Sequence, residues 1–463
     1  YSILGAGKHP ALFISNKNLM SQTVALHTLG CKLNFSETST IGNQFLKNGF
    51  SVVDMNDKAD VYVFNTCTVT ENAEKECRQL VRRVLRNNPE AYIIVTGCYA
   101  QLRADEISEI DGVDAVLGSN EKFEIFSLLK DFNKKELSCI YVSPNDELNK
   151  FGVASSTDAD SRTRAYFKIQ DGCDYKCTFC TIPLARGKSR SMNPDLVVEE
   201  FTNLVKQGYK EIILTGVNVG DYGKSYNFNL YELLKKLIQV DGDFRIRISS
   251  IEPNLLTDEI ISLTAESEKL CNHFHIPLQS GSDTVLRSMQ RRYTTEDYKK
   301  VILKAQQLIP DLGIGVDVIV GYPGETEIEF METYNFLLNL PISYLHVFTY
   351  SERPDTKALT LSESVDPAER KRRNKMLRIL SDKKKNYFYN QMIGKNIDVL
   401  FESESEDGRI KGFSSNYVRF QHNYDKNFRN QVCSINVKGI KDGLAYGEIK
   451  EIKNSVALEI SSI

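Results

Sequence analysis

The feature that most constrains this chain is a group of three closely spaced cysteines in the segment DGCDYKCTFC, namely Cys173, Cys177 and Cys180. Their spacing is C-x3-C-x2-C, whereas structural zinc sites usually combine C-x2-C pairs into four ligands. No fourth cysteine or histidine follows closely. Three thiolates on a four-iron cluster leave one iron without a protein ligand, and that open iron can chelate a substrate or cofactor. The motif therefore predicts an iron–sulfur site with an open iron.

The remaining cysteines argue against a disulfide-stabilised fold. Ten cysteines in 463 residues are too sparse for such a scaffold. The N-terminus shows no secretory pattern, so we expect a cytosolic location, where thiols stay reduced unless a metal holds them. Residues 1–19 fit no element, and we expect them to be a tag or an uncertain start. Isolated cysteines are expected to be inert thiols; these are Cys77, Cys139, Cys271 and Cys433.

Charge and hydropathy exclude two classes of protein. The net charge is -3, from 58 Lys+Arg against 61 Asp+Glu, so no strong overall field favours nucleic acid or a membrane surface. No apolar run reaches the length of roughly 18 residues that a membrane-spanning helix needs. Any contact with nucleic acid must therefore depend on local patches.

Residues 20–143 alternate between strand and helix patterns. Strands are predicted at 23–30, 60–66, 91–97 and 113–118, and helices at 36–48, 71–87 and from 103. This order predicts an α/β domain with a parallel sheet covered by helices. Cys31, Cys67 and Cys98 each lie just after a predicted strand. Because the carboxyl ends of parallel strands share one edge, these three cysteines are expected to converge on a second metal site.

A polar segment at 144–162 reads as a linker, and a second α/β region follows it. Strands are predicted at 165–172, 211–216, 245–253, 272–281, 313–324 and 343–351, interleaved with helices that include 194–207 and 231–240. Repeated βα units over 163–390 predict a full or partial (β/α) barrel with its chemistry at the strand carboxyl ends. The region ends in a basic helical segment at 366–390.

The last part of the chain, 391–455, changes character. Short strand patterns at 396–403, 408–420, 431–440 and 443–452 are separated by Gly, Asn and Asp. Such spacing predicts a small all-β barrel. Aromatic side chains are frequent there, and about half are expected in the barrel core while others could stack on bases; they are Phe413, Tyr417, Phe420 and Tyr424, with Arg419 and His422 interleaved.

Several segments together resemble the radical S-adenosylmethionine methylthiotransferase family. They are TLGCKLNFSET, NTCTVTENAEKECRQ, VTGCYAQ, DGCDYKCTFCTIPLARGKSRS, ILTGVNVGDYG, SSIEP, HIPLQSGSD and DVIVGYPGET. The pair TLGCKLN and NTCTVT is most similar to the group that acts on N6-threonylcarbamoyladenosine in tRNA, the MtaB type. The resemblance covers nearly all of residues 20–453 and implies a C-terminal TRAM domain for the predicted β-barrel.

The resemblance also implies cofactors and the residues that hold them. It implies two [4Fe-4S] clusters, a radical cluster on Cys173, Cys177 and Cys180 and an auxiliary cluster on Cys31, Cys67 and Cys98. Six further positions would line an S-adenosylmethionine site, with Phe179 near the adenine; they are Phe179, Gly216, Asn218, Ser249, Glu252 and Gln279.

The implied reaction places a methylthio group on C2 of an adenosine at tRNA position 37. That C–H bond is neither acidic nor electrophilic, so cofactors carry the hard chemistry. Asp317 and Glu252 could steer protons. The implied partners are a tRNA anticodon stem-loop and an electron donor such as a flavodoxin or ferredoxin, with no membrane. Cationic side chains near the barrel mouth and in the C-terminal barrel are expected to contact the RNA, aided by the helix at 370–385; they are Arg186, Lys188, Arg190, Arg291, Arg292 and Arg419.

Three alternatives stay open on the sequence. The same cysteine plan also serves methylthiotransferases that act on isopentenyladenosine tRNA or on an aspartate of a ribosomal protein. Residues 391–453 hold ten Lys+Arg against nine Asp+Glu, which favours neither RNA nor a basic protein, whereas the basic helix favours RNA. A non-enzymatic RNA-binding protein with a structural metal would bind zinc or no iron and would not cleave S-adenosylmethionine.

Overall fold

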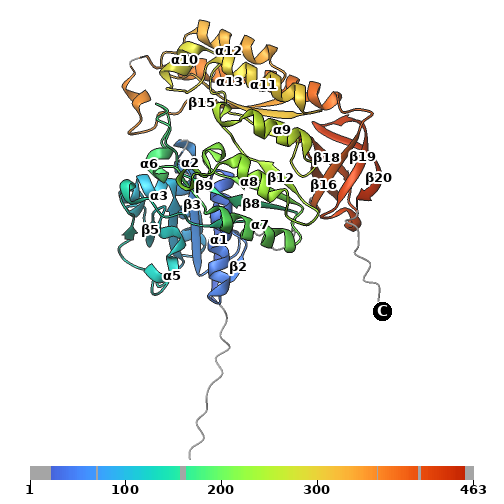
Figure 1. Ribbon diagram of the computed structural model, residues 1–463. Coiled ribbons are helices and arrows are strands. Elements are labelled where there is room, and N and C mark those ends of the chain that lie inside the picture. The colour runs from blue at the N-terminus through green and yellow to red at the C-terminus, as the bar shows by residue number, and fades with distance from the viewer. Residues whose placement is uncertain (1–21, 69–70, 157–162, 362, 405–407, 454–463) are drawn as a thin grey trace, which may run out of the picture.

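The computed structural model describes residues 22–68, 71–156, 163–361, 363–404 and 408–453 (Figure 1). The segment expected to be a tag, 1–19, lies outside the described residues, as does part of the predicted linker. Among the described residues, no helix is both long and apolar enough to cross a membrane.

The N-terminal domain is a six-stranded parallel sheet in the order β2-β1-β3-β4-β5-β6. Its central strands, VYVFNT and YIIVTG, are buried along their whole length, as parallel strands covered on both faces require. Its elements are β1 Thr23–Thr28, α1 Lys32–Lys47, β2 Ser51–Val53, β3 Val61–Thr66, α2 Glu71–Asn87, β4 Tyr92–Gly97, α3 Cys98–Leu102, α4 Ala104–Ser108, β5 Ala115–Leu117, η1 Glu121–Phe123, α5 Ile125–Leu128 and β6 Cys139–Tyr141.

Three features differ from the sequence-based expectation. Helix α1 begins at Lys32, four residues earlier than predicted, because Gly30 turns the chain sharply with φ +123° and leaves Cys31 at the helix N-cap. The three-residue strand β2 was not predicted, since a strand this short carries little alternation. Within the predicted linker, β7 (Ala154–Ser155) pairs antiparallel with the first barrel strand.

The central domain is a partial barrel of six parallel strands: β8 Arg164–Lys168, β11 Glu211–Thr215, β12 Arg245–Ile248, β13 His273–His275, β14 Gly313–Val320 and β15 Tyr344–Thr349. Ladders join β8, β11 and β12 on one side and β13, β14 and β15 on the other. Isolated bridges, including one between Ser250 and His275, connect the two halves. The barrel stays open between β15 and β8 among the described strands.

Amphipathic helices cover the outside of this partial barrel (Figure 1). They are α7 Pro194–Lys206, α8 Leu230–Leu237, α9 Asp258–Glu266, α10 Asp283–Ser288, α11 Thr295–Leu308, α12 Glu327–Asn339 and α13 Pro367–Asn390. The short strands β9 (Gln170–Asp171) and β10 (Arg190–Ser191) pair antiparallel. The cysteine motif and the helix α6 (Ile182–Arg186) lie in the connection between them. Short 3-10 turns complete the connections: η2 Asn145–Glu147, η3 Val219–Asp221, η4 Lys224–Tyr226, η5 Pro253–Leu255, η6 Lys357–Thr360 and η7 Lys426–Phe428.

The C-terminal domain is a closed five-stranded β-barrel in the order β16-β17-β18-β20-β19. Its strands are β16 Asn396–Glu404, β17 Arg409–Ser414, β18 Arg419–Asn423, β19 Val432–Lys441 and β20 Leu444–Lys453. The loop around residues 413–417 packs against the N-terminal ends of the central strands, where Arg245 and Arg247 donate to its carbonyls. Helix α1 of the first domain packs against β7 and β8, so this domain lies at the open side of the partial barrel.

Candidate active site

The motif cysteines lie together where the first barrel strand ends. Gly172 precedes them with φ +69°, and a Cβ there would lie 2.0 Å from the Lys188 carbonyl oxygen, so only glycine fits this turn. The Cys173 amide then donates to Gly187 O at 3.1 Å, and the Cys180 amide donates to Cys177 O at 3.1 Å. These backbone contacts hold the three thiols on one short loop, as the sequence predicts.

Without a bound metal, the environment of this loop favours protonated thiols over thiolates. Burial raises the pKa of Cys173 to about 11 and that of Cys180 to about 12, and neighbouring cysteines add to both shifts. Bound metal must therefore displace protons from these thiols. In the described part of the chain, the only trio of His, Cys, Asp or Glu ligand atoms within 4.8 Å of one another contains no cysteine. Three thiolates on one loop suit a cluster with an open iron better than structural zinc, which usually takes four ligands.

Buried polar atoms without partners lie at the ends of the adjacent strands. Asn218 is 4% exposed, and neither its amide nitrogen nor its amide oxygen has a partner among the described residues. The hydroxyl oxygens of Thr215 and Ser249 are buried without partners in the same way. Buried polar groups are normally hydrogen-bonded, so this strand edge is built to receive a polar ligand. These atoms fit S-adenosylmethionine, which offers ribose hydroxyls and an amino acid moiety.

Unlike Asn218, Glu252 already has a partner within the protein, because its carboxylate is paired with the Arg291 guanidinium. The Arg291 guanidinium also donates to Cys177 Sγ at 3.0 Å and to Tyr293 Oη at 3.0 Å. The Arg291 side chain is 3% exposed. The expectation that Arg291 contacts RNA is therefore wrong: its charge is used inside the protein, beside the motif cysteines. A cation at Cys177 stabilises bound thiolate.

A cavity of about 230 Å³ opens next to Cys180. Phe179 and Gln279, both predicted near the cofactor, line it together with Asp317 and Arg353. Gln279 adopts φ +69°, an unusual conformation for a non-glycine residue, and its backbone is tied to β14 on both sides. Gly216 lies against Gln170, whose side-chain oxygen would be 2.8 Å from a Cβ at this position.

The second cysteine trio converges at the edge of the N-terminal sheet. A Cβ on Gly30 would lie 2.6 Å from Cys67 Cβ, so Cys67 is pressed against the turn that carries Cys31. Burial raises the pKa of the Cys98 thiol, and the nearby Cys31 adds to the shift. The structure thus brings together three residues that are far apart in the sequence, as the strand-end argument predicts.

Arg186 joins this trio to the central domain and is buried completely. Its guanidinium donates to Cys98 Sγ at 3.2 Å, to Asn34 Oδ1 at 2.7 Å and to Glu37 Oε1 at 2.9 Å. It also pairs with Asp171 at 3.1 Å. The expectation that Arg186 contacts RNA is wrong, since it is 1% exposed and all these partners lie inside the protein.

Glu37 is the centre of this buried ionic network, and no sequence motif marks it. Lys122 and Lys168 approach its carboxylate at 2.7 and 3.1 Å, in addition to Arg186. Although burial opposes ionisation, these three cations hold the pKa of Glu37 well below its usual range. The network fixes the N-terminal domain against the end of β8, so the two cysteine trios keep a set distance.

The other four cations predicted to bind RNA differ in how exposed they are. Arg190 is nearly buried, because it bonds the Lys150 and Arg186 carbonyls and pairs with Asp171. Lys188 and Arg292 are exposed at the same mouth. Arg419 lies over the Phe413 ring with its guanidinium carbon 4.5 Å from the ring centroid.

Helix α13 and the C-terminal barrel were also predicted to contact RNA, and each contains both buried and exposed side chains of the predicted kind. In α13, Arg370 and Arg373 are buried and pair with Glu352 and Glu325. The exposed cations of the helix are Lys371, Arg372, Lys375, Arg378 and Lys383, of which Arg372 pairs with Glu327 and Glu369. Of the four C-terminal barrel aromatics, Phe413 and Phe420 are buried, Tyr417 is half-buried and Tyr424 is exposed.

Some residues at the site were not predicted at all. Arg353, 5% exposed, lines the cavity beside Cys180 and donates to Thr68 Oγ1 at 3.3 Å, next to Cys67. His275 and His346 contact Asp317 inside the barrel. No local motif marks Arg353 or His346, whereas His275 lies in HIPLQSG, at the end of a predicted strand, which is a signal that could have been followed.

Comparison with known proteins identifies the class to which this fold belongs. Residues 167–337 match the Radical SAM superfamily, and residues 23–118 match Uncharacterized protein family UPF0004. Among solved structures, the radical S-adenosylmethionine methyltransferase TsrM from Kitasatospora setae aligns over 73% of this chain and 77% of its own, with a TM-score of 0.54 and 16% identity. The cobalamin-dependent radical enzyme OxsB aligns over 80% and 56%, with a TM-score of 0.50 and 13% identity. The fold and the three-cysteine loop are those of a radical S-adenosylmethionine protein, a class that implies S-adenosylmethionine and a [4Fe-4S] cluster.

Sequence relatives narrow the class further. Threonylcarbamoyladenosine tRNA methylthiotransferase MtaB of Bacillus subtilis is 41% identical over 435 residues, 92% of this chain and 95% of the relative. The protein of the same name from Aquifex aeolicus is 39% identical over 82% and 93%. The tRNA-2-methylthio-N(6)-dimethylallyladenosine synthase of Clostridium novyi is 32% identical over 86% and 90%. The chain belongs to the radical S-adenosylmethionine methylthiotransferase family, with the MtaB type as its most similar group among these.

Proposed function

We propose that this chain is a tRNA methylthiotransferase that converts N6-threonylcarbamoyladenosine at position 37 to its 2-methylthio derivative. The observation that carries the proposal is the pairing of two three-cysteine sites across one domain interface, joined by Arg186. The extent of similarity to the MtaB relatives, 41% identity over 92% of the chain, supports the choice of substrate. A cytosolic location, where thiols stay reduced, is part of the proposal.

The two cysteine trios would hold different [4Fe-4S] clusters. Cys173, Cys177 and Cys180 would hold the radical cluster, and Cys31, Cys67 and Cys98 an auxiliary cluster, each with one iron open. When bound, these groups and S-adenosylmethionine supply the carbon radical that breaks the C2–H bond and the sulfur that replaces hydrogen. The protein's own contribution is to hold thiolates, orient the cofactor and shape the chamber between the trios.

Named side chains perform these tasks. Arg291 at Cys177 and Arg186 at Cys98 place a buried cation beside each trio, which favours bound thiolate. Asn218 and Ser249 offer unpaired polar atoms to S-adenosylmethionine. Lys188 and Arg292, exposed at the mouth, would contact the phosphates of the anticodon loop, where a base is extruded at lower cost than from a duplex. A small one-electron donor such as a flavodoxin or ferredoxin would reduce the radical cluster.

The decisive experiment is anaerobic reconstitution with iron and sulfide, followed by S-adenosylmethionine, reductant and tRNA that carries threonylcarbamoyladenosine. Mass analysis of the digested nucleosides should show a methylthio gain on that nucleoside. 5′-Deoxyadenosine without this gain would redirect the substrate to isopentenyladenosine tRNA or the ribosomal protein. Tight zinc binding with no cleavage of S-adenosylmethionine would instead favour the non-enzymatic alternative.

Two variants separate the cysteine sites. Cys173→Ala should abolish 5′-deoxyadenosine formation, because it removes a ligand of the radical cluster. Cys67→Ala should retain some cleavage of S-adenosylmethionine and lose methylthiolation. Cys77→Ala, a buried cysteine outside both trios, is the matched control and should retain both activities. Full product from Cys67→Ala would refute the auxiliary role.

A further inference from the structure

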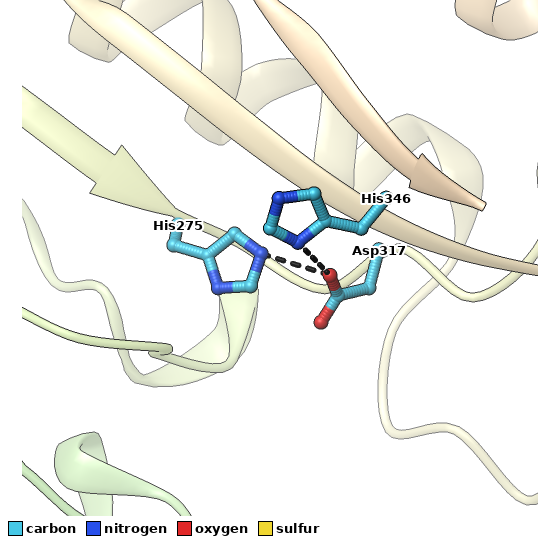
Figure 2. Close-up of side chains that lie close together, drawn as sticks. All are labelled: His275, Asp317 and His346. Carbon is cyan, nitrogen blue, oxygen red and sulfur yellow. Dashed lines mark hydrogen bonds and ion pairs between the residues drawn. The ribbon is translucent and has the colours of Figure 1, made fainter. Parts of the chain in front are cut away.

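Two histidines and an aspartate meet inside the partial barrel, on three adjacent strands (Figure 2). His275 Nε2 on β13 lies 2.8 Å from Asp317 Oδ1 on β14, and His346 Nδ1 on β15 lies 3.3 Å from the same oxygen. Ser250 Oγ lies 2.6 Å from His275 Nδ1, so both nitrogens of this ring have partners. Although burial opposes ionisation, His275 and His346 hold the pKa of Asp317 below its usual range.

One end of this cluster faces the radical site. Asp317 lines the 230 Å³ cavity that also contacts Cys180 and Phe179. His346 is half-exposed and stands on the same face of β15 as Phe348, which lines that cavity too. The free polar atoms of the cluster therefore open toward the space beside the radical cysteines.

The other end of the cluster leads to the second cysteine trio. The Tyr344 ring lies 5.3 Å from that of His346 and stacks on Tyr417 at 6.0 Å. Tyr417 comes from the C-terminal barrel and adopts φ +69°, a strained conformation, and its ring also packs on those of Phe413 and His273 at 4.7 and 4.6 Å. Above this ring, at 5.9 Å, lies the ammonium of Lys32, the residue that follows Cys31.

The chemistry of this lining is polar and partly cationic. The second carboxylate oxygen of Asp317 can accept hydrogen bonds from N–H groups, and His346 Nε2 can donate or accept one. The Tyr344 hydroxyl already bonds His273 Nε2 at 2.9 Å, and the Tyr417 ring already stacks on Phe413, so these two residues shape the subsite. No carboxylate within the described ranges lies within 4.0 Å of the Lys32 ammonium, so its charge is available to an anionic ligand. An apolar isopentenyl group would leave Asp317 Oδ2 and the Lys32 ammonium without a partner from the ligand, which is unfavourable.

We propose that the cluster of His275, Asp317 and His346, extended by Tyr344, Tyr417 and Lys32, is the subsite that receives the N6 substituent of the target base and selects a carbamoyl group bearing a carboxylate over an apolar group. The inference rests on the proposed function, because it places the target base between the two cysteine trios. Asp317 would accept from the carbamoyl N–H groups, and Lys32 would pair with the carboxylate.

The test measures RNA binding rather than turnover. Anticodon stem-loops of one sequence carry threonylcarbamoyladenosine, isopentenyladenosine or plain adenosine at position 37, and reconstituted enzyme is titrated anaerobically without reductant. Wild type should bind the threonylcarbamoyl RNA at least about tenfold more tightly than the adenosine RNA, since hydrogen bonds to charged groups are involved. His346→Leu and Lys32→Met should each reduce that preference to about two- or threefold, with binding of the isopentenyl RNA unchanged or improved.

His346→Asn is the matched control, because its amide nitrogen replaces Nδ1 as the donor to Asp317 and should retain most of the preference. Equal binding of the three RNAs by wild type, or an unchanged preference in both His346→Leu and Lys32→Met, would overturn the subsite. Stoichiometric zinc that is lost in His346→Leu would also overturn it, since the imidazoles would then be metal ligands. Failure of the proposed function looks different: no methylthio product forms on any RNA, whatever the binding ratios.

Discussion

At the scale of single residues, this site contains two kinds of buried polar side chain. In the committed kind, the polar atoms are paired within the protein; in the open kind, they have no partner among the described residues. Arg186 and Glu37 belong to the committed kind, with ionic partners on every side. Asn218 belongs to the open kind, with neither amide atom paired among the described residues. Because burying a polar group without a partner costs free energy, the two kinds signal different roles. Committed groups stabilise the interface between the N-terminal and central domains, and open groups can hydrogen-bond a ligand.

Asn218→Ala should weaken S-adenosylmethionine binding by about tenfold, because it removes hydrogen bonds that only the ligand completes. Iron content should not change, since Asn218 forms no hydrogen bond to a cysteine among the described residues. Equilibrium binding to the reconstituted enzyme checks this, with Asn339→Ala on the surface of α12 as the matched control. Equal affinity in the two variants would remove Asn218 from the cofactor site.

Glu37→Gln should destabilise the protein by about 3–5 kcal/mol at pH 7, because it removes the counter-charge of buried Lys122 and leaves Asp171 as the partner of both Arg186 and Lys168. The pKa of Glu37 is lowered in the folded state, so its ionised form stabilises the fold above the unfolded pKa of about 4.3 and ceases to do so as pH falls toward the folded pKa. The difference in Tm between wild type and Glu37→Gln should thus be full at pH 6–7 and narrow below about pH 4. Glu90→Gln, at an exposed carboxylate, should show no such difference.

At the scale of elements, the sequence allowed much of the architecture to be predicted, and the reason is periodicity. Fully apolar strands such as VYVFNT identified the parallel sheet, and the position of Cys31, Cys67 and Cys98 after such strands predicted their convergence. The cluster of His275, Asp317 and His346 could not be predicted, because register across β13, β14 and β15 brings together residues that no local pattern links. Arg186 was misread for a related reason, since charge alone does not reveal that a partner domain buries it.

The turn between β1 and α1 provides a test of how an element positions a ligand. Gly30→Ala introduces a Cβ at 2.6 Å from Cys67 Cβ, closer than carbon atoms can approach, at a φ of +123°. We expect the N-terminal trio to lose most of its iron while 5′-deoxyadenosine formation continues, as measured by iron analysis and product assay. Gly49→Ala has a comparable φ of +86° but no atom within 4 Å, and should retain both. Full iron in Gly30→Ala would show that the turn tolerates displacement.

At the scale of the whole molecule, the proposed subsite and the two cysteine trios draw on all three domains. The N-terminal domain supplies Cys31 and Lys32, the central barrel supplies Cys180 and Asp317, and the C-terminal barrel supplies Tyr417. A β-barrel that served only to hold RNA at the surface would not place a strained tyrosine beneath the central strands. If the proposed subsite is correct, the docking of this barrel should matter for both stability and substrate choice.

Arg247 is the residue that tests this docking. It pairs with Glu211 inside the central barrel at 2.8 Å, donates to the carbonyls of Ser414 and Ser415 at 3.1 and 2.9 Å, and lies 5.0 Å from the Tyr417 ring centroid. Arg247→Met removes these contacts at about the same size, while Arg245 remains to pair with Glu211. We expect a loss of about 3 kcal/mol in docking.

That loss should make the segment between α13 and β16 sensitive to limited proteolysis and release the C-terminal barrel as a folded fragment. Arg378→Met, at an exposed position of α13, should behave as wild type. The same Arg247→Met protein should lose its preference for threonylcarbamoyl RNA without losing 5′-deoxyadenosine formation, because Tyr417 leaves the chamber while the radical cysteines stay. Release of the barrel with the preference intact would mean that Tyr417 contributes nothing to substrate choice.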